Sequence, residues 1–256
     1  MVQEAKKIEQ QATAAPELKT PAKPFTSDPA AQKLLAEVLA AHTGGKPELL
    51  AKLKQCRFTR TGQIEQPNGR FSSIWTTTLA WPDRYRLATE QIGVATNSMT
   101  YASSPNGAWL YPAGPDNKDK ATMPPEILLT LLLQNQEDAV SLLFALTEPG
   151  IVVQGGTPDT LDGQPVLKLE VWNAALPYAR IDVDAATKLV KRITYNGREM
   201  TSPIVKELLL LNSADYSGIK LASRILVKGG GRTLAEWNEF TVEFLPVVDP
   251  KLFEQP

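Results

Sequence analysis

The sequence predicts an α+β protein: a strongly curved antiparallel sheet of about eleven strands, with helices covering its concave face. Two observations carry this prediction. Most of the chain after residue 55 alternates polar and apolar residues in stretches joined by short turns, which is typical of an antiparallel meander and not of βαβ units. Residues 124–146 instead carry apolar side chains on nearly all sides, so these helices must be enclosed. An open half-barrel wrapped around them satisfies both requirements.

The first 27 residues differ from the rest of the chain. They are rich in Ala, Lys, Gln, Thr and Pro and contain almost nothing to bury, so we predict a disordered arm or linker over 1–27 and a single domain over 28–256. No apolar run follows Met1, and we expect no signal peptide within this sequence. The arm is either the start of a cytosolic protein or a stalk behind a removed export or anchor segment.

A first helix is predicted to begin after Asp28, a suitable N-cap. His42 and the pair Gly44–Gly45 end it, and a short helical turn follows over residues 47–53. The apolar face of this helix consists of Leu34, Leu35, Val38 and Leu39.

Strands are predicted on both sides of the apolar helices. The first two, over 57–66 and 71–81, form a hairpin around Pro67-Asn68-Gly69. In the second of them, one face carries Phe71, Ser73, Trp75, Thr77, Leu79 and Trp81. The further predicted strands lie near residues 84–91, 98–102, 108–111, 151–154, 166–172, 178–183, 189–195, 204–211, 219–228 and 233–245.

Two apolar helices are predicted in the middle of the chain, Pro125 to Gln134 and Glu137 to Leu146. In the first, we expect a narrow stripe of polar residues to face water, namely Glu126, Thr130 and Gln134. In the second, the polar positions are Glu137, Asp138 and Ser141. Both helices are far too short to span a bilayer, which needs about 20 apolar residues.

Composition and motifs argue against catalysis. The net charge is −1 with a pI of about 6.0, which gives no field for nucleic acid. Only one His and one Cys are present, so no internal disulfide can form and no cluster has zinc-ligand spacing. No Ser/His/Asp or Cys/His pair exists away from His42 itself. We expect His42 to be a helix cap or surface residue, Cys56 an inert thiol, Asp182 and Asp184 the polar face of a strand, and Gly229–Gly231 a hairpin turn. We predict no cofactor and no metal.

Three stretches give the chain a family resemblance: Trp81 to Leu87, Asn106 to Pro112, and a C-terminal set at 179–193, 214–221 and 249–253. In this order they resemble the outer-membrane lipoprotein carrier (LolA-like or LolB-like) superfamily. The resemblance implies an unclosed half-barrel with a hydrophobic lining, lid helices over it, and acceptance of lipoprotein acyl chains in the periplasm. The long polar arm and the glycine-rich loop at 229–231 depart from that family, so an exported relative is indicated rather than the carrier itself.

The predicted function is non-enzymatic binding or transport of a hydrophobic or lipidated ligand in the bacterial cell envelope. The alternative is a packed, ligand-free barrel that acts as a sensor or binds other envelope proteins. We expect a periplasmic or exported monomer whose partner is a lipid or a lipoprotein acyl chain. Arg84 is either a polar residue at the mouth of the barrel or an ordinary surface arginine. The candidate cavity residues, for which core packing is the competing interpretation, are Phe71, Trp75, Leu79, Trp81, Tyr85, Leu87, Trp109, Tyr111, Leu128, Leu129, Leu132, Leu143 and Phe144.

Overall fold

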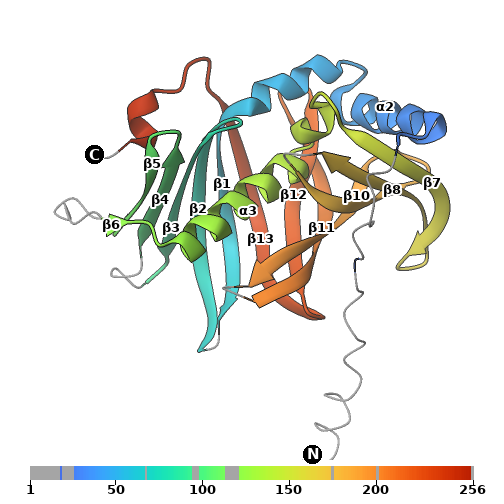
Figure 1. Cartoon of the computed structure of the whole chain (residues 1–256). Coiled ribbons are helices and arrows are strands. Elements are labelled where there is room, and N and C mark those ends of the chain that lie inside the picture. Colours follow the sequence, from blue (N-terminus) through green and yellow to red (C-terminus); the bar gives the residue numbers. More distant parts are fainter. Residues whose placement is uncertain are drawn as a thin grey trace, which may run out of the picture.

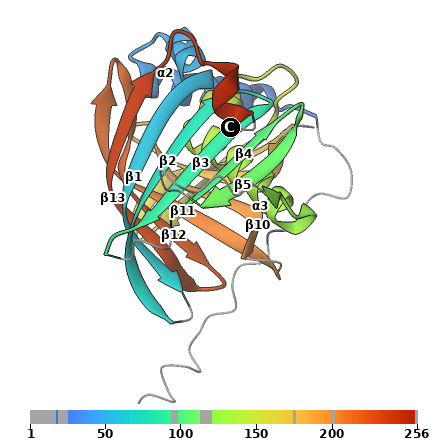
Figure 2. The same ribbon diagram turned by 90° about the vertical axis from the view of Figure 1, so that its left-hand side faces the viewer.

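The computed structural model describes residues 18, 26–66, 68–93, 98–112, 121–173, 176–199 and 202–254. The strands of this part form one antiparallel sheet of thirteen, in the order β6-β5-β4-β3-β2-β1-β13-β12-β11-β10-β9-β8-β7. The sheet does not close, since β6 and β7 stay at its two edges, and it curves around the helix α3 (Figures 1 and 2). The predicted fold class is confirmed. The predicted arm over 1–27 lies outside the described residues, except for Leu18, Thr26 and Ser27.

The thirteen strands follow the predicted meander closely. Their bounds are β1 Gln55–Gln66, β2 Gly69–Ala80, β3 Arg84–Gln91, β4 Met99–Ser104, β5 Gly107–Pro112, β6 Ala121–Thr122, β7 Val152–Leu161, β8 Gln164–Asn173, β9 Leu176–Asp184, β10 Val190–Glu199, β11 Ser202–Tyr216, β12 Ile219–Gly229 and β13 Arg232–Phe244. The two-residue strand β6 is the one that the sequence pattern did not indicate.

Bulges assist the curvature. The β1–β13 pairing shifts register between Thr61 and Gly62, and a Cβ on Gly62 would lie 2.0 Å from the Glu236 carbonyl oxygen. Only glycine therefore permits this close approach of the two backbones. The β7–β8 pairing shifts between Gly155 and Thr157 in the same way. A sheet bent at such points can wrap around a helix rather than lie flat against it.

The helical segments are α2 Pro29–Thr43, η1 Pro47–Lys54, α3 Pro125–Ser141, η2 Phe144–Thr147 and η3 Pro250–Phe253. The prediction of two helices within 125–146 was wrong, because residues 135–136 contain no helix breaker and α3 continues through them. It ends where Leu143 adopts a left-handed backbone (φ 67°), and η2 follows as a single 3-10 turn. At α2 the prediction is confirmed: Asp28 accepts a hydrogen bond from the Ala30 N–H, and Gly44 is the left-handed C-cap.

The core lies on the concave side of the sheet. The helix α2 packs on β7 and β12, and α3 lies nearest β9, β10 and η2. One continuous apolar cluster joins α2, α3, η1, η2 and the concave face of the sheet. Its largest fully buried side chains include Phe58, Leu79, Phe144, Leu169 and Ile181. The apolar half of the strand alternation therefore faces inward, as predicted.

His42 was predicted to be a cap or surface residue, and that prediction was wrong. The imidazole is 4% exposed. Its Nδ1 lies 2.5 Å from the Lys220 carbonyl oxygen, and its Nε2 accepts a hydrogen bond from the Val190 N–H at 3.0 Å. The end of α2 packs against the sheet, so this helix terminus is not in water. Burial lowers the pKa of His42, and the two contacts define a neutral imidazole with its proton on Nδ1.

Asp182 was expected on a wet face but is fully buried, because the Arg192 guanidinium covers it, with Nε 2.6 Å from Oδ2. Asp184 behaves as predicted and accepts hydrogen bonds from the Ala186 and Thr187 N–H groups of the following turn. Cys56 is fully buried, and burial raises the pKa of its thiol, so the reactive thiolate is disfavoured.

Candidate functional site

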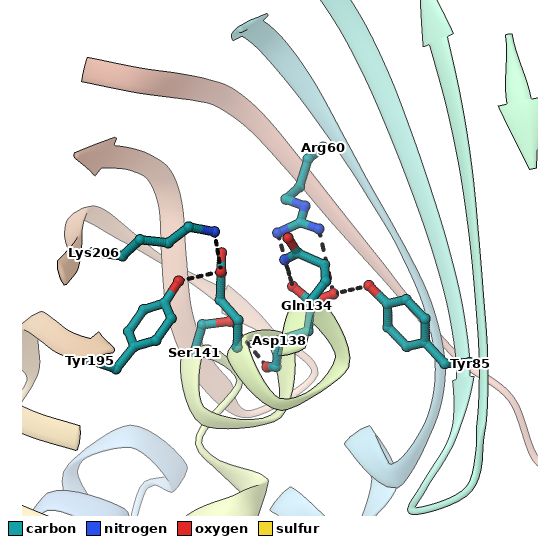
Figure 3. Close-up of polar contacts among 8 residues, drawn as sticks. Arg60, Tyr85, Gln134, Asp138, Ser141, Tyr195 and Lys206 are labelled. Carbon is teal, nitrogen blue, oxygen red and sulfur yellow. Dashed lines mark hydrogen bonds and ion pairs between the residues drawn. The ribbon is translucent and has the colours of Figure 1, made fainter. Parts of the chain in front are cut away.

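The helix α3 carries two adjacent acids whose side chains reach opposite halves of the sheet. Asp138 contacts β1 and β3, and Glu137 contacts β10 and β11. Neighbouring residues on a helix point about 100° apart, so two consecutive carboxylates can contact strands on two different sides of the sheet. We call the whole set the α3 network; it consists of Arg60, Tyr85, Gln134, Glu137, Asp138, Tyr195 and Lys206 (Figure 3).

The Asp138 carboxylate accepts hydrogen bonds from three side chains. Arg60 approaches with Nη1 3.0 Å from Oδ1 and Nη2 3.5 Å from Oδ2. The Tyr85 hydroxyl donates to Oδ2 at 2.5 Å, and Gln134 Nε2, one helical turn earlier, donates to Oδ1 at 3.2 Å. Arg60 and Tyr85 come from strands, so this carboxylate attaches α3 to the β1–β3 wall of the sheet.

The Glu137 carboxylate makes the equivalent attachment on the other side. Its Oε2 accepts a hydrogen bond from the Tyr195 hydroxyl and lies 3.1 Å from the Lys206 ammonium nitrogen. In Figure 3 Tyr195 and Lys206 approach α3 from the side opposite to Arg60 and Tyr85. One turn of one helix therefore connects strands that stand on both sides of the curved sheet.

The charged side chains of the network are largely shielded from solvent. The side chains of Arg60 and Asp138 are 5% and 1% exposed, and those of Lys206 and Glu137 are 16% and 7% exposed. Such charges are tolerated in a core only when they are paired, and here two cations face two carboxylates.

The two carboxyl groups have pKa values displaced in opposite directions. Burial raises the pKa of Asp138, and neither the Arg60 charge nor the bonds it accepts from Tyr85 and Gln134 cancel this effect. For Glu137, burial also acts upward, but Lys206, the Tyr195 hydroxyl and Arg60 together hold its pKa below the usual range. Burial beside these carboxylates raises the pKa of both tyrosines well above the ordinary value, so both remain hydrogen-bond donors.

Arg60 also lies among aromatic rings. Its guanidinium carbon is 5.2 Å from the ring centre of Phe58, 5.7 Å from that of Trp75 and 5.5 Å from that of Trp237. These distances are in the range of cation–π attraction. The buried Nε of Arg60 finds no acceptor in the part of the chain that the structure describes. Arg60 is thus a cation fixed in an apolar wall, with one donor still unused.

The predicted cavity residues fall into three groups. Buried in the core are Leu79, Tyr85, Leu87, Leu143 and Phe144, whereas Phe71, Trp75, Trp81, Trp109, Tyr111 and Leu128 are partly buried. Leu129 and Leu132 are 42% and 43% exposed on the outer side of α3. The expectation that α3 is enclosed all round was therefore wrong, since an open half-barrel covers one side of the helix only.

The polar stripe of α3 is also placed differently from the prediction. Glu126 and Thr130 are exposed, as expected, but Gln134 turns inward and belongs to the α3 network. Arg84 lies at the start of β3, where its guanidinium is 3.4 Å from the carboxylate of its neighbour Asp83. The arginine that binds α3 is Arg60, which sequence reasoning missed. Its strand alternation held a usable signal, because Arg60 is in phase with Phe58 on the concave face.

A pocket of about 30 Å³ lies where His42, Leu143, Val190 and Leu221 meet, which is room for about two water molecules and not for an acyl chain. No helix within the described ranges is long and apolar enough to cross a membrane. Those ranges also contain no cluster of three or more His, Cys, Asp or Glu side chains that could hold a metal ion.

An open, strongly curved antiparallel sheet with a helix across its concave face defines the half-barrel class to which LolA-like proteins belong. Solved structures with this fold include a LolA superfamily protein from Nitrosomonas europaea (10% identity, TM-score 0.54, covering 88% of this chain and 97% of that one). A DUF1329 family protein from Desulfovibrio piger matches at 15% identity and TM-score 0.53, over 89% of this chain and 98% of that one. A domain from Vibrio parahaemolyticus, provisionally assigned to outer membrane lipoprotein sorting, matches at 14% identity and TM-score 0.51, over 88% and 96%.

No protein-family model and no curated protein matches the sequence. At these identities the likeness concerns the fold, and at that level the resemblance to the LolA-like superfamily is confirmed.

Proposed function

We propose that this protein binds a hydrophobic or lipidated ligand, such as a lipid or the acyl chains of a lipoprotein, in the bacterial periplasm or cell envelope, without catalysis. One observation carries the proposal: α3 lies across the apolar concave face of a sheet that is open on one side, and half of this helix stays partly exposed. A helix in that position can be replaced by a ligand chain. The fold shared with a LolA superfamily protein and a lipoprotein-sorting domain supports this assignment.

In the proposed mechanism, residues around Pro124 to Leu146 move away from the concave face and the ligand's chain takes their place. Each buried methylene of that chain contributes about 0.8 kcal/mol, so a chain can offset the apolar contacts that α3 gives up. The α3 network makes such an exchange feasible. Buried ion pairs contribute little net stability, because the cost of desolvating both charges offsets most of their attraction. They can still define a single closed position for the helix.

The chemistry of the buried polar groups also favours binding over catalysis. Both tyrosines of the network have raised pKa values and stay protonated. Burial raises the pKa of the Cys56 thiol, and both nitrogens of His42 are already engaged by backbone groups. None of these groups is placed as an activated nucleophile beside a free base.

The test combines lipid analysis with a binding titration. The purified protein is examined by native mass spectrometry and lipid extraction, and a fluorescent fatty-acid probe is titrated into it. In Glu137→Gln the helix loses its charge contact with Lys206, so we expect the probe to bind several-fold more tightly than to the wild type. Glu207→Gln is the matched control, because Glu207 is a partly buried carboxylate (17% exposed) that contacts Arg192 rather than α3. If no lipid co-purifies and the probe binds to none of these proteins, the carrier proposal fails.

A second candidate function is a packed module that binds another envelope protein through its surface. It is favoured by the continuous apolar cluster through which α3 packs on the concave face, and by the exposed side chains of Leu129 and Leu132 on the outer face of α3. Hydrogen exchange separates the two functions. Ligand exchange requires amides of residues 125–133 to open more readily than those of the surrounding strands, whereas a permanently packed module protects them equally.

A further inference from the structure

The α3 network contains an arrangement that lid opening alone does not require. Four of its side chains belong to the sheet, and all four are hydrogen-bond donors: Arg60, Tyr85, Tyr195 and Lys206. Two of them carry a positive charge. The acceptors that they bind, Glu137 and Asp138, both belong to α3. Apart from Gln134 of α3, which donates to Asp138 Oδ1, the donors of the network belong to the wall and the acceptors to the helix.

The four donors point into the concave side, where a ligand chain would lie. Arg60 is in phase with buried Phe58 on β1, and Tyr85 with buried Leu87 on β3. On the other wall, Tyr195 is in phase with Ile193 and Lys206 with Leu208, both of which belong to the core. Alternation along each strand therefore fixes these polar groups on the apolar face.

Withdrawal of α3 would remove both carboxylates together and leave two cations in that wall. Arg60 would keep its surroundings of Phe58, Trp75 and Trp237 but lose its counter-ion. An unpaired charge beside apolar groups is unfavourable by several kcal/mol, so a neutral ligand would leave this deficit uncorrected. A ligand with its own carboxylate or phosphate would restore the pairing.

We propose that the concave face selects an anionic amphiphile: the ligand's acyl chain replaces the apolar side chains of α3, and its anionic head group binds Arg60, Lys206, Tyr85 and Tyr195 in place of Glu137 and Asp138. This inference rests on the proposed function and adds the charge of the ligand to it. The unused Nε donor of Arg60 indicates that the wall offers more hydrogen bonds than the helix carboxylates accept. A phosphate or a second carboxylate oxygen can use it.

The experiment compares two fluorescent probes with the same hydrocarbon chain, one ending in a free carboxylate and the other in its methyl ester. We expect the carboxylate probe to bind at least about tenfold more tightly, which corresponds to about 1.4 kcal/mol. If both probes bind with equal affinity, the charge selection is refuted while hydrophobic binding stands. If neither binds, the proposed function fails and this inference fails with it.

Two variants test whether the α3 network causes the preference for the carboxylate probe. In Lys206→Met the preference for the carboxylate probe should fall several-fold, while affinity for the ester is unchanged or higher. The matched control is Lys168→Met, which removes a partly exposed lysine paired with Asp159 outside the network, and it should leave both affinities as in the wild type. An equal loss of carboxylate binding in both variants would mean general electrostatic attraction and would overturn the assignment.

A final arm separates an amphiphile site from a simple anion site. Inorganic phosphate is added at millimolar concentration to the protein with bound carboxylate probe. We expect no displacement, because phosphate brings no chain to replace α3. Displacement by phosphate alone would show that an anion is sufficient to displace α3. It would refute the proposal that the ligand must be an amphiphile. Circular dichroism of each variant confirms that it is folded before its affinity is compared.

Discussion

The two halves of α3 are attached to the sheet by different kinds of contact, polar in one half and apolar in the other. Residues 134–141 are held on both sides by charged and hydrogen-bonded contacts, and Asp138 and Ala139 are fully buried. Residues 125–133 make no ion pair among the described contacts, and their inner side packs through apolar groups such as Leu131. Directional contacts fix one end of the helix in place. Residues 125–133 pack through burial, which any apolar group can supply. Just before them, the Met123 N–H donates to the Ala108 carbonyl oxygen of β5.

This difference indicates which part of the helix moves. A ligand chain can replace apolar contacts one by one along residues 125–133. The network at residues 134–141 has to release both carboxylates before the helix can leave the sheet altogether. Partial opening at the N-terminal half is therefore expected to be easier than complete displacement.

The largest effect on stability is expected for Asp138→Ala, which removes a central carboxylate of the α3 network. It leaves Arg60 charged and unpaired in the core and removes the acceptor of Tyr85. We expect a loss of about 3–5 kcal/mol in the free energy of unfolding, the cost of an uncompensated buried charge. Urea denaturation followed by tryptophan fluorescence measures it.

Glu243→Ala is the control for that measurement, because Glu243 pairs with Arg57 on the exposed surface. It should change the free energy of unfolding by less than about 1 kcal/mol. Equal losses in the two variants would mean that the buried network does not fix α3 more strongly than an ordinary surface pair.

A second prediction compares two leucines of the apolar half. Leu131 is 4% exposed and Leu129 is 42% exposed. Leu131→Ala should lower the free energy of unfolding by about 2–4 kcal/mol, because a buried cavity is created. Leu129→Ala should change it by about 0.5 kcal/mol or less, as for other surface positions. A large loss in Leu129→Ala, measured by the same denaturation, would show that the outer face of α3 is covered in solution.

Sequence patterns were sufficient for the fold because the strands obey simple rules. The alternation in 71–81 identified the concave face, since Ser73, Thr77 and Leu79 are all buried there. Proline and glycine turns separated the strands correctly. The helix boundary inside 125–146 was missed because Leu143 stops α3 through its backbone conformation, and leucine carries no signal for a left-handed residue.

The site was harder to predict because its residues are polar and buried. Glu137 and Asp138 have the residue types of a solvated helix face, and nothing in their own segment reveals that Lys206 and Arg60 lie opposite. These partners are 69 and 78 positions away along the chain. Pairing across such a distance depends on the curvature of the sheet, which local periodicity does not contain.

The mildest test concerns the other helix, α2, whose end is fixed by the neutral imidazole of His42 between β10 and β12. Burial lowers the pKa of His42 and outweighs the hydrogen bond to the Lys220 carbonyl oxygen, which acts in the opposite direction. The unfolded chain therefore binds a proton more readily than the folded protein, so this contribution to stability is complete above the ordinary pKa of about 6.5 and is lost as pH falls toward the folded value. Between pH 7.5 and 5.5 we expect the free energy of unfolding to fall by roughly 1 kcal/mol, since each unit of lowering corresponds to about 1.4 kcal/mol.

His42→Gln should lose that dependence, because glutamine does not titrate. If the variant retains the same fall in stability between pH 7.5 and 5.5, His42 is not the titrating group. The Asp138 carboxyl of the α3 network cannot account for that fall either, because burial raises its pKa. The sign then distinguishes the two groups. A carboxyl with a raised pKa makes the protein more stable as pH falls, whereas the histidine makes it less stable. A falling stability that depends on His42 would therefore assign the titration to this buried residue at the end of α2.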